Sequence, residues 1–237
     1  MTERKTSRPE GAVPREWVPV IGRIVVSVVF VGGLFVVAGR VDWIQGWVFL
    51  AVFLGYVACL IWRLAQSNPE LLAERGNTGE NVENWDKVVM GIYTGLLLLL
   101  IVVAALDSGR YAWSRVPIGV QVAAWVGLGL SGAAIWHVMA VNAYLSSMVR
   151  IQKDRGHQVA TEGLYGHIRH PMYLAIVVLM FCVPLVLGSL WALIPGGMIA
   201  ALFVYRTARE DRTLIEKLPG YGEYAQHVRY RLLPGVW

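Results

Sequence analysis

The chain of 237 residues is 56% hydrophobic and only 16% charged, with a mean hydropathy of +0.52. This composition excludes an ordinary soluble domain, which would expose too much apolar surface to water. A net charge of +5 could suggest a nucleic-acid partner, but the basic residues lie between apolar runs, so membrane topology explains them and no nucleic acid is expected. Cys59 and Cys182 both lie inside apolar runs, so we expect neither a disulfide framework nor a metal site.

Six apolar segments approach the length of about 20 residues that a helix needs to cross a bilayer core. The predicted spans are about Val18–Ala38, Trp43–Trp62, Val88–Leu106, Pro117–Tyr144, Pro171–Leu187 and Leu190–Tyr205. Between the second and third spans, Pro69–Arg75 predicts a short interfacial helix. Only Gly188-Ser189 separates the last two spans, which predicts a tight antiparallel hairpin whose second arm continues as a helix to about Leu218. The predicted fold class is all-α, a multi-pass integral membrane helical bundle of about six spans.

The distribution of positive charge supports this count. Nearly all Lys and Arg residues fall in the N-terminal segment, in the connections after the second and fourth spans, and in the C-terminal tail. Six spans place these parts on one side, which the excess of positive charge identifies as the cytoplasm. Both termini, the 145–170 connection and the 206–237 tail are therefore predicted to be cytoplasmic.

The 145–170 connection leads into the stretch Gly163–Tyr173, in which Pro171 is suited to begin a helix. Arg169 and His170 would then lie at the helix N-terminus, an end that favours anions. Cationic side chains there indicate either a basic turn at the membrane surface or a site where something negative binds.

A second polar cluster lies where the last hairpin arm leaves the apolar region. Arg206 and Glu210 are four residues apart and share one helix face. Because the hairpin returns its second arm beside the first, we expect this pair near His170 and Tyr173. The alternative is an ion pair on a solvated helix end, which would contribute little to stability.

Two further patterns favour structural interpretations. Gly127–Gly132 matches GxGxxG but lies within an apolar span with no preceding strand, so its small residues are interpreted as helix-packing positions. His137, in the same span, is interpreted as a satisfied or pore-facing histidine. His167 and His170 are three residues apart, but no third ligand has zinc-site spacing, so no metal site is predicted.

The C-terminal half carries an ordered set of motifs: Gln152, His157–Tyr165, Arg169–Tyr173, Arg206, Glu210-Asp211 and Tyr221–Tyr224. In this combination, the chain from about Asn142 to Trp237 resembles the isoprenylcysteine carboxyl methyltransferase family, within a wider group that includes phospholipid N-methyltransferases. It departs from the family at Ala175, where glycine is usual, and at Asp211, which replaces the second glutamate of a common Glu-Glu pair.

The resemblance implies a methyltransferase that uses S-adenosylmethionine at the cytoplasmic membrane surface. It implies a cofactor site formed by Gln152, His157, Gln158, Val159, Ala160, Tyr165, His170, Pro171, Met172 and Tyr173, with Arg206 and Glu210 binding and orienting the acceptor. The chain is accordingly divided into a polar N-terminal segment (1–17), four N-terminal spans (18–145) and a cofactor-binding region with the hairpin and tail (146–237). The expected partners are the lipid bilayer and a lipophilic small-molecule or prenylated acceptor, and the oligomeric state is left open.

Several acceptors are compatible with these residues. The nearest family activity is carboxyl O-methylation of isoprenylcysteine, in which Arg206 could hold the acceptor carboxylate by bidentate hydrogen bonds. A phospholipid amine or a small thiol is the first alternative, and Glu210 could then help to remove a proton from an amine. Alternatives from other classes are an NADPH-dependent enzyme similar to the sterol reductases and a non-catalytic scaffold or transporter.

Overall fold

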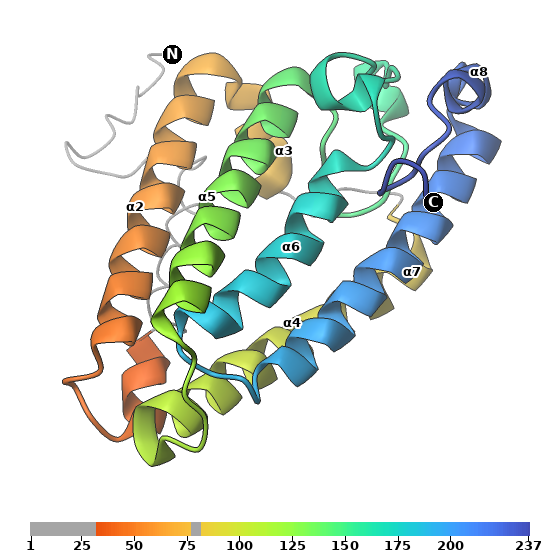
Figure 1. The fold of residues 1–237 in the computed structure, drawn as a ribbon. Coiled ribbons are helices and arrows are strands. Elements are labelled where there is room, and N and C mark those ends of the chain that lie inside the picture. The colour runs from red at the N-terminus through yellow and green to blue at the C-terminus, as the bar shows by residue number, and fades with distance from the viewer. Residues whose placement is uncertain (1–31, 77–81) are drawn as a thin grey trace, which may run out of the picture.

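The computed structural model describes residues 32–76 and 82–237, and every regular element within these ranges is helical (Figure 1). The elements are α2 (Ile44–Ser67), α3 (Pro69–Gly76), α4 (Asn84–Ala104), the π-helix η2 (Ala105–Tyr111), α5 (Ile118–Val141), the 3-10 turns η3 (Lys153–Arg155) and η4 (Gly163–Gly166), α6 (Pro171–Val186), α7 (Leu193–Lys217) and α8 (Tyr221–His227). Residues 32–38 are also helical. The predicted all-α class is confirmed, while segment 1–17 and most of the first predicted span lie outside the described residues.

Three helical segments are long and apolar enough to cross a membrane: α2, α4 together with η2, and α5. They correspond to the second, third and fourth predicted spans. The hairpin differs from two full spans, because α6 has only 16 residues and α7, at 25 residues, carries charged side chains along its second half. The described residues therefore give three long apolar helices and a hairpin that is apolar in α6 and in the first half of α7, and the count of six spans remains a prediction.

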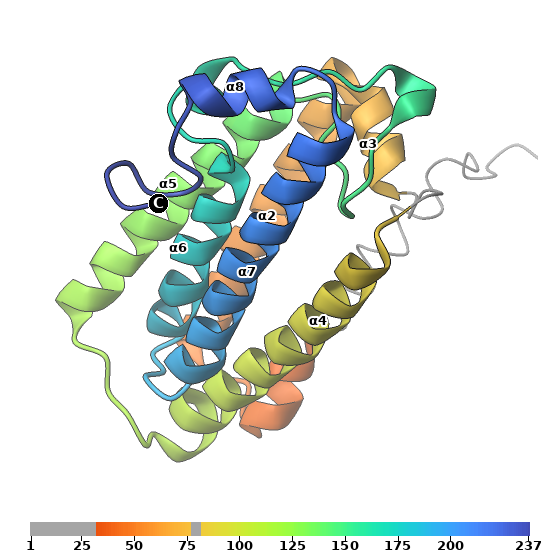
Figure 2. The same ribbon diagram turned by 90° about the vertical axis from the view of Figure 1, so that its right-hand side faces the viewer.

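The helices alternate in direction, so their connections gather at two ends of the bundle (Figures 1 and 2). We call the end with α3, η3, η4 and α8 the site end, and the end with η2 and the α6–α7 turn the far end. The connections that the charge pattern assigned to one side do lie together, at the site end. Their assignment to the cytoplasm remains a prediction.

Close helix packing fixes the hairpin and its neighbour α5. A Cβ atom on Gly196 of α7 would lie 2.5 Å from the carbonyl oxygen of Met180 on α6. On α5, a Cβ atom on Gly127 would lie 2.7 Å from Sγ of Cys182 on α6. Gly132 faces Tyr56 of α2, whose hydroxyl donates to the Gly132 carbonyl at 2.9 Å. Gly127 and Gly132 of the GxGxxG pattern are thus packing positions, as predicted, whereas Gly129 is exposed and a Cβ atom there would meet nothing within 4 Å.

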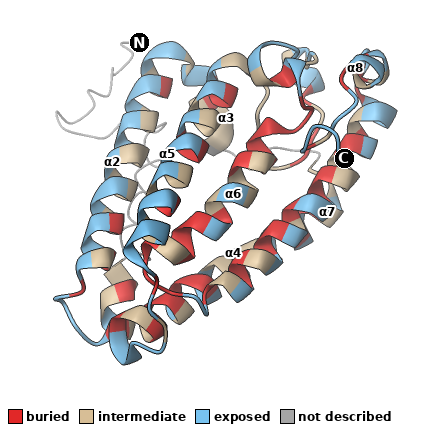
Figure 3. Ribbon diagram, viewed as in Figure 1, coloured by how far each residue is buried: buried red, intermediate tan, exposed pale blue. Residues whose placement is uncertain are grey.

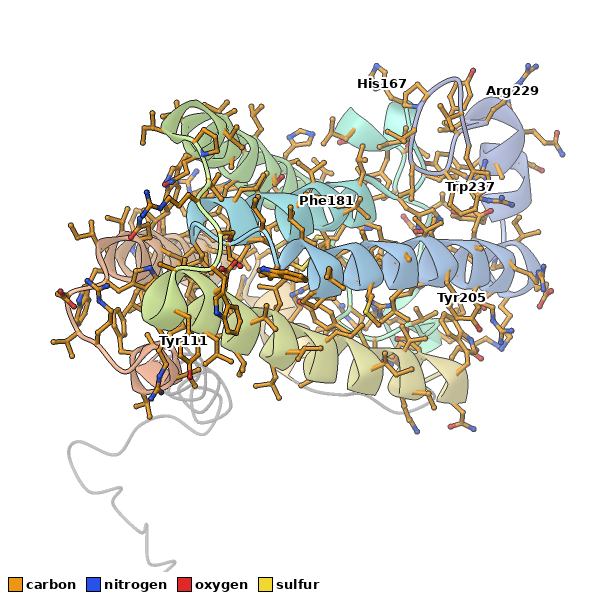
Figure 4. The ribbon with its side chains drawn as sticks, turned by 60° about the horizontal axis from the view of Figure 1, so that its bottom comes forward. Tyr111, His167, Phe181, Tyr205, Arg229 and Trp237 are labelled. Atoms are coloured by element: carbon orange, nitrogen blue, oxygen red, sulfur yellow. The ribbon has the colours of Figure 1, made fainter. Side chains whose placement is uncertain are left out.

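The outward faces of the helices are exposed and largely apolar (Figure 3). Figure 4 shows Tyr111 at the far end, His167 and Arg229 at the site end, and Phe181 and Tyr205 on the hairpin between them. Both hairpin side chains are nearly half exposed. Such a surface is suited to lipid contact.

A buried polar cluster joins the elements of the far end. Asp107 of η2 is fully buried and accepts hydrogen bonds from the backbone N–H of Ser114 (2.8 Å) and from the hydroxyl groups of Ser114 (2.5 Å) and Ser189 (2.6 Å). The Ser108 hydroxyl donates to the carbonyl oxygen of Leu187 at 2.6 Å. These bonds tie η2 and the loop after it to the turn of the hairpin.

Candidate functional site

A cavity of about 240 Å³ lies at the site end, bounded by the connection between α5 and α6 and by α4, α6, α7 and α8. Part of its wall is polar, and part is formed by apolar or aromatic side chains of the long helices, namely Met90, Tyr93, Ile176 and Phe203. A second hollow of about 180 Å³ shares Asn142, Tyr144 and residues 158–160 with it.

Most of the predicted site residues line this cavity. They are His157, Gln158, Val159, Ala160, Tyr165, His170, Met172, Tyr173, Arg206 and Glu210. Gln152 and Pro171 are not among the lining residues. Pro171 is buried as the first residue of α6, as its ring geometry predicts. The hairpin and the connection before it therefore bring together segments that are up to about 50 residues apart in the chain.

Gln152 is fully buried behind the cavity wall. Its Nε2 donates to the carbonyl oxygen of Tyr144 at 2.7 Å, and its Oε1 accepts from Nη1 of Arg155 at 2.7 Å. Its backbone N–H points to Nδ1 of His157 at 3.4 Å. Gln152 thus orders the wall and is held away from the cavity.

His157 forms part of the polar wall and stacks on Tyr144, with ring centroids 4.8 Å apart. Burial, together with the nearby cations Arg150 and Arg155, lowers the pKa of His157 to about 4. The imidazole is therefore neutral at neutral pH. Since its Nδ1 accepts from the backbone of Gln152, we assign its proton to Nε2.

Of the two alternatives for Arg169 and His170, the structure shows a negative group beside them, and this group is a side chain of the protein itself. Asp211 of α7 accepts from Nε and Nη2 of Arg169 (2.7 and 2.8 Å), Nε of Arg231 (2.8 Å) and the hydroxyl of Tyr221 (3.0 Å), and it lies 3.2 Å from Nε2 of His170. Burial alone would raise the pKa of Asp211, but hydrogen bonds from His170, Arg169 and Arg231 outweigh it and hold this pKa well below its ordinary value. Asp211 is a structural hub that joins the start of α6 to α7, α8 and the tail.

The two polar clusters meet, as the hairpin predicted. The hydroxyl of Tyr173 donates to Glu210, and the Tyr173 ring lies parallel to His170 with centroids 5.7 Å apart. The guanidinium carbon of Arg206 lies 5.1 Å from the centroid of the Tyr173 ring. Among the described residues that line the cavity, Glu210 is the only one with an acidic side chain.

Arg206 is held differently from what the sequence suggested. Its Nε and Nη2 donate to the two carboxylate oxygens of Asp86, at the start of α4, at 2.8 and 2.9 Å. Its Nη2 also donates to the carbonyl oxygen of Ser147 at 3.1 Å. The bidentate edge expected to hold an acceptor carboxylate is therefore occupied, and only Nη1 of Arg206 makes no hydrogen bond to the described residues.

Side chains of α3 and α4 support the cavity wall, a role that the sequence analysis missed. Arg150 donates to Glu74 through Nε (3.0 Å) and Nη2 (2.8 Å), and Nη1 of Arg75 donates to the carbonyl oxygen of Leu145 at 3.0 Å. Arg75 also lines the cavity. The available signal was the group of charges in the connection after the second span, which was used only for membrane topology.

Two tyrosines after the hairpin complete the wall. Tyr221 and Tyr224 line the cavity, and the Tyr224 hydroxyl donates to the carbonyl oxygen of Tyr165 at 2.7 Å. The Tyr165 hydroxyl accepts from Nδ2 of Asn142 at 2.8 Å. The sequence analysis noted both tyrosines only as part of a motif, without assigning them a position. His137, by contrast, is exposed in the last turn of α5 and is not a cavity residue.

Residues 125–216 match the isoprenylcysteine carboxyl methyltransferase (ICMT) family. This match includes most of α5, the connection that forms the polar wall, and the hairpin. The resemblance inferred from the motifs is thus confirmed over this segment. It leaves α2, α3, α4 and α8 unmatched.

The chain is also 33% identical over 96 residues to Delta(14)-sterol reductase TM7SF2 of Mus musculus. The aligned part is 39% of this chain and 23% of the reductase. The chain therefore spans about a quarter of the length of this curated relative.

Proposed function

We propose that the chain is a membrane-embedded methyltransferase that uses S-adenosylmethionine to methylate a lipophilic acceptor. The observation that carries this proposal is the convergence of ten side chains, expected from the family resemblance, on one cavity. A wall that is polar near the connection and apolar along the long helices suits a reaction between a polar donor and a lipophilic acceptor.

The chemistry of the wall fits such a donor. S-adenosylmethionine supplies a methyl group on a positively charged sulfur, which needs positioning and a dry site more than further activation. Neutral His157 and Gln158 offer hydrogen-bond partners for a nucleoside. The adjoining hollow, which shares Tyr144 and residues 158–160, extends the space beyond the main cavity. We propose that these residues hold the donor.

The acceptor would bind beside Glu210, Tyr173 and Arg206. Carboxyl O-methylation of isoprenylcysteine is the nearest family activity, and a carboxylate acceptor is already ionised at neutral pH. Because Asp86 occupies the bidentate edge of Arg206, such a carboxylate would reach this side chain only through Nη1. An amine acceptor would instead have to lose a proton, which Glu210 could take up. A lipophilic thiol is the third acceptor class compatible with the site.

A second candidate function follows from the similarity to the sterol reductase. In this alternative, the same cavity would hold NADPH, and its residues would orient a sterol-like substrate. The two candidates differ in the ligand that binds, so one experiment separates them.

The test is calorimetric titration of the detergent-purified protein with S-adenosylmethionine, S-adenosylhomocysteine and NADPH. Ala160 lines the cavity, so the added indole ring of Ala160→Trp should lower the affinity for both adenosyl ligands at least tenfold. Lys153→Trp is the matched control, since Lys153 is exposed in the same connection and lines neither hollow. Saturable adenosyl binding that only Ala160→Trp weakens supports the methyltransferase. Binding of NADPH alone by folded protein would replace it with the reductase.

A further inference from the structure

We infer that Asp86 is a positioning residue for the acceptor side of this site, acting through Arg206. The inference rests on the proposed function and adds to it a residue from outside the segment that matches the methyltransferase family. Asp86 lies in the first turn of α4, 120 residues before Arg206.

Asp86 is fully buried, and its carboxylate joins three parts of the site. It accepts hydrogen bonds from Nε and Nη2 of Arg206, on α7. Its Oδ2 also accepts from the backbone N–H of Val149, in the cavity wall, at 2.7 Å. A buried carboxylate is costly unless it is paired and hydrogen-bonded, and Asp86 satisfies both conditions. One side chain therefore fixes α4, α7 and the wall relative to one another.

This contact decides which partner Arg206 takes. Arg206 and Glu210 are four residues apart on α7, a spacing at which opposite charges commonly pair. In the described structure, Arg206 pairs with Asp86, while Glu210 accepts from the Tyr173 hydroxyl. Asp86 thereby keeps Glu210 from being bound by Arg206 and leaves its carboxylate in the cavity beside Tyr173.

The same contact fixes the guanidinium plane. It holds the Arg206 guanidinium carbon 5.1 Å from the centroid of Tyr173 and 5.7 Å from that of Phe203. Both rings line the cavity. Loss of the Asp86 charge would release a long cationic side chain at the position where the acceptor is proposed to bind, and small displacements at a reacting centre can lower the rate about 100-fold.

The decisive variant is Asp86→Asn, which keeps the size of the side chain and removes its charge. Glu83→Gln is the matched control. Glu83 immediately precedes α4 and also pairs with α7, through Nζ of Lys217 at 2.5 Å, but this pair is partly exposed and lies outside the cavity lining. Asp86→Glu is the second variant, because it keeps the charge and moves the carboxylate by one methylene group.

The assay measures transfer of a tritiated methyl group from S-adenosylmethionine to a carboxylate, an amine and a thiol acceptor. The probes are N-acetyl-S-farnesylcysteine, dioleoylphosphatidylethanolamine and decanethiol. With whichever probe the wild type methylates, Asp86→Asn should lower kcat/KM at least tenfold while the Kd for S-adenosylmethionine changes less than about threefold. Asp86→Glu should also lower kcat/KM, and Glu83→Gln should have the kcat/KM of the wild type.

A double-mutant cycle separates positioning from general support of the fold. If Asp86 acts through Arg206, the double variant Asp86→Asn, Arg206→Gln should be no less active than Arg206→Gln alone. Additive losses would overturn the inference, as would wild-type activity in Asp86→Asn or, should that variant not fold, in Asp86→Glu. In each of those outcomes the proposed function stands. A wild type that methylates none of the probes would overturn the proposed function and this inference with it.

Discussion

The substitution Asp211→Asn tests the hub at the start of α6. In the native structure, Asp211 accepts hydrogen bonds from Arg169, Arg231 and Tyr221 and contacts His170. An asparagine keeps one acceptor oxygen and replaces the other with an NH₂ group. Where that group replaces Oδ1, the bonds from Nε of Arg169 and from the Tyr221 hydroxyl are lost. Where it replaces Oδ2, it would face Nη2 of Arg169 and Nε of Arg231, so two hydrogen bonds to charged groups are lost.

Hydrogen bonds to charged groups contribute about 1.5–3 kcal/mol each, so two lost bonds correspond to about 3–6 kcal/mol. Removing one partner of a buried ion pair typically costs about 3–5 kcal/mol, which agrees with that sum. We therefore expect Asp211→Asn to lower the free energy of unfolding by about 3–5 kcal/mol. For a chain of this size, 1 kcal/mol shifts Tm by about 2–4 °C, so the expected fall in Tm is about 6–20 °C.

The measurement is thermal unfolding in detergent, followed by intrinsic tryptophan fluorescence. Asp154→Asn is the control, because Asp154 also pairs with an arginine of the site, Arg150, but at 3.5 Å and with 64% of its side chain exposed. An exposed pair of this kind contributes at most about 1 kcal/mol. Equal Tm shifts for Asp211→Asn and Asp154→Asn would refute the argument that Asp211 is a hub.

Two further predictions concern the cavity wall and the hairpin. The pKa of His157 is about 4 in the folded chain against an ordinary value of 6.5, so only the unfolded chain takes up this proton as the pH falls through that interval. The free energy of unfolding should therefore fall as the pH is lowered from 6.5 to 4. In His157→Phe, which keeps an aromatic ring against Tyr144, it should fall less over this range, as measured by chemical denaturation at several pH values. In the hairpin, Gly196→Ala should lower Tm because its Cβ would meet the Met180 carbonyl oxygen at 2.5 Å, whereas Gly197→Ala, with nothing within 4 Å, should leave Tm unchanged or raise it. Equal effects of the two alanines would contradict the packing described for α6 and α7.

The helices and their order could be predicted from the sequence because the signals for them are local. The length of the apolar runs predicted α2, α4 and α5, and Pro171 predicted the start of α6. Continuation of α7 past the apolar region to Lys217 was also predictable, because Pro219 is the first residue after Arg206 that breaks a helix.

The partners of the buried charges could not be predicted, because they depend on contacts between distant parts of the chain. Arg206 was expected to meet a ligand, but its partner Asp86 is 120 residues away and looked like the polar border of a span. Arg169 and His170 were expected to form either a basic turn or a site where something negative binds, and the negative group is Asp211, 42 residues after Arg169. Sequence spacing describes which residues share a helix face, but not which faces meet.

The far end of the bundle has a consequence for how a ligand can enter. Asp107 clamps η2 and its following loop to the hairpin turn through the two serine hydroxyls, and no residue of this cluster lines the cavity. Separating the helices at the far end would break these buried hydrogen bonds, so we expect the helices to move apart more easily at the other end. The part that can open is the site end, where the cavity wall between α5 and α6 contains only two short 3-10 turns. We therefore expect any widening of the cavity that admits a bulky molecule to separate the helices at the site end, where the ion pairs of Asp86 and Asp211 would oppose it.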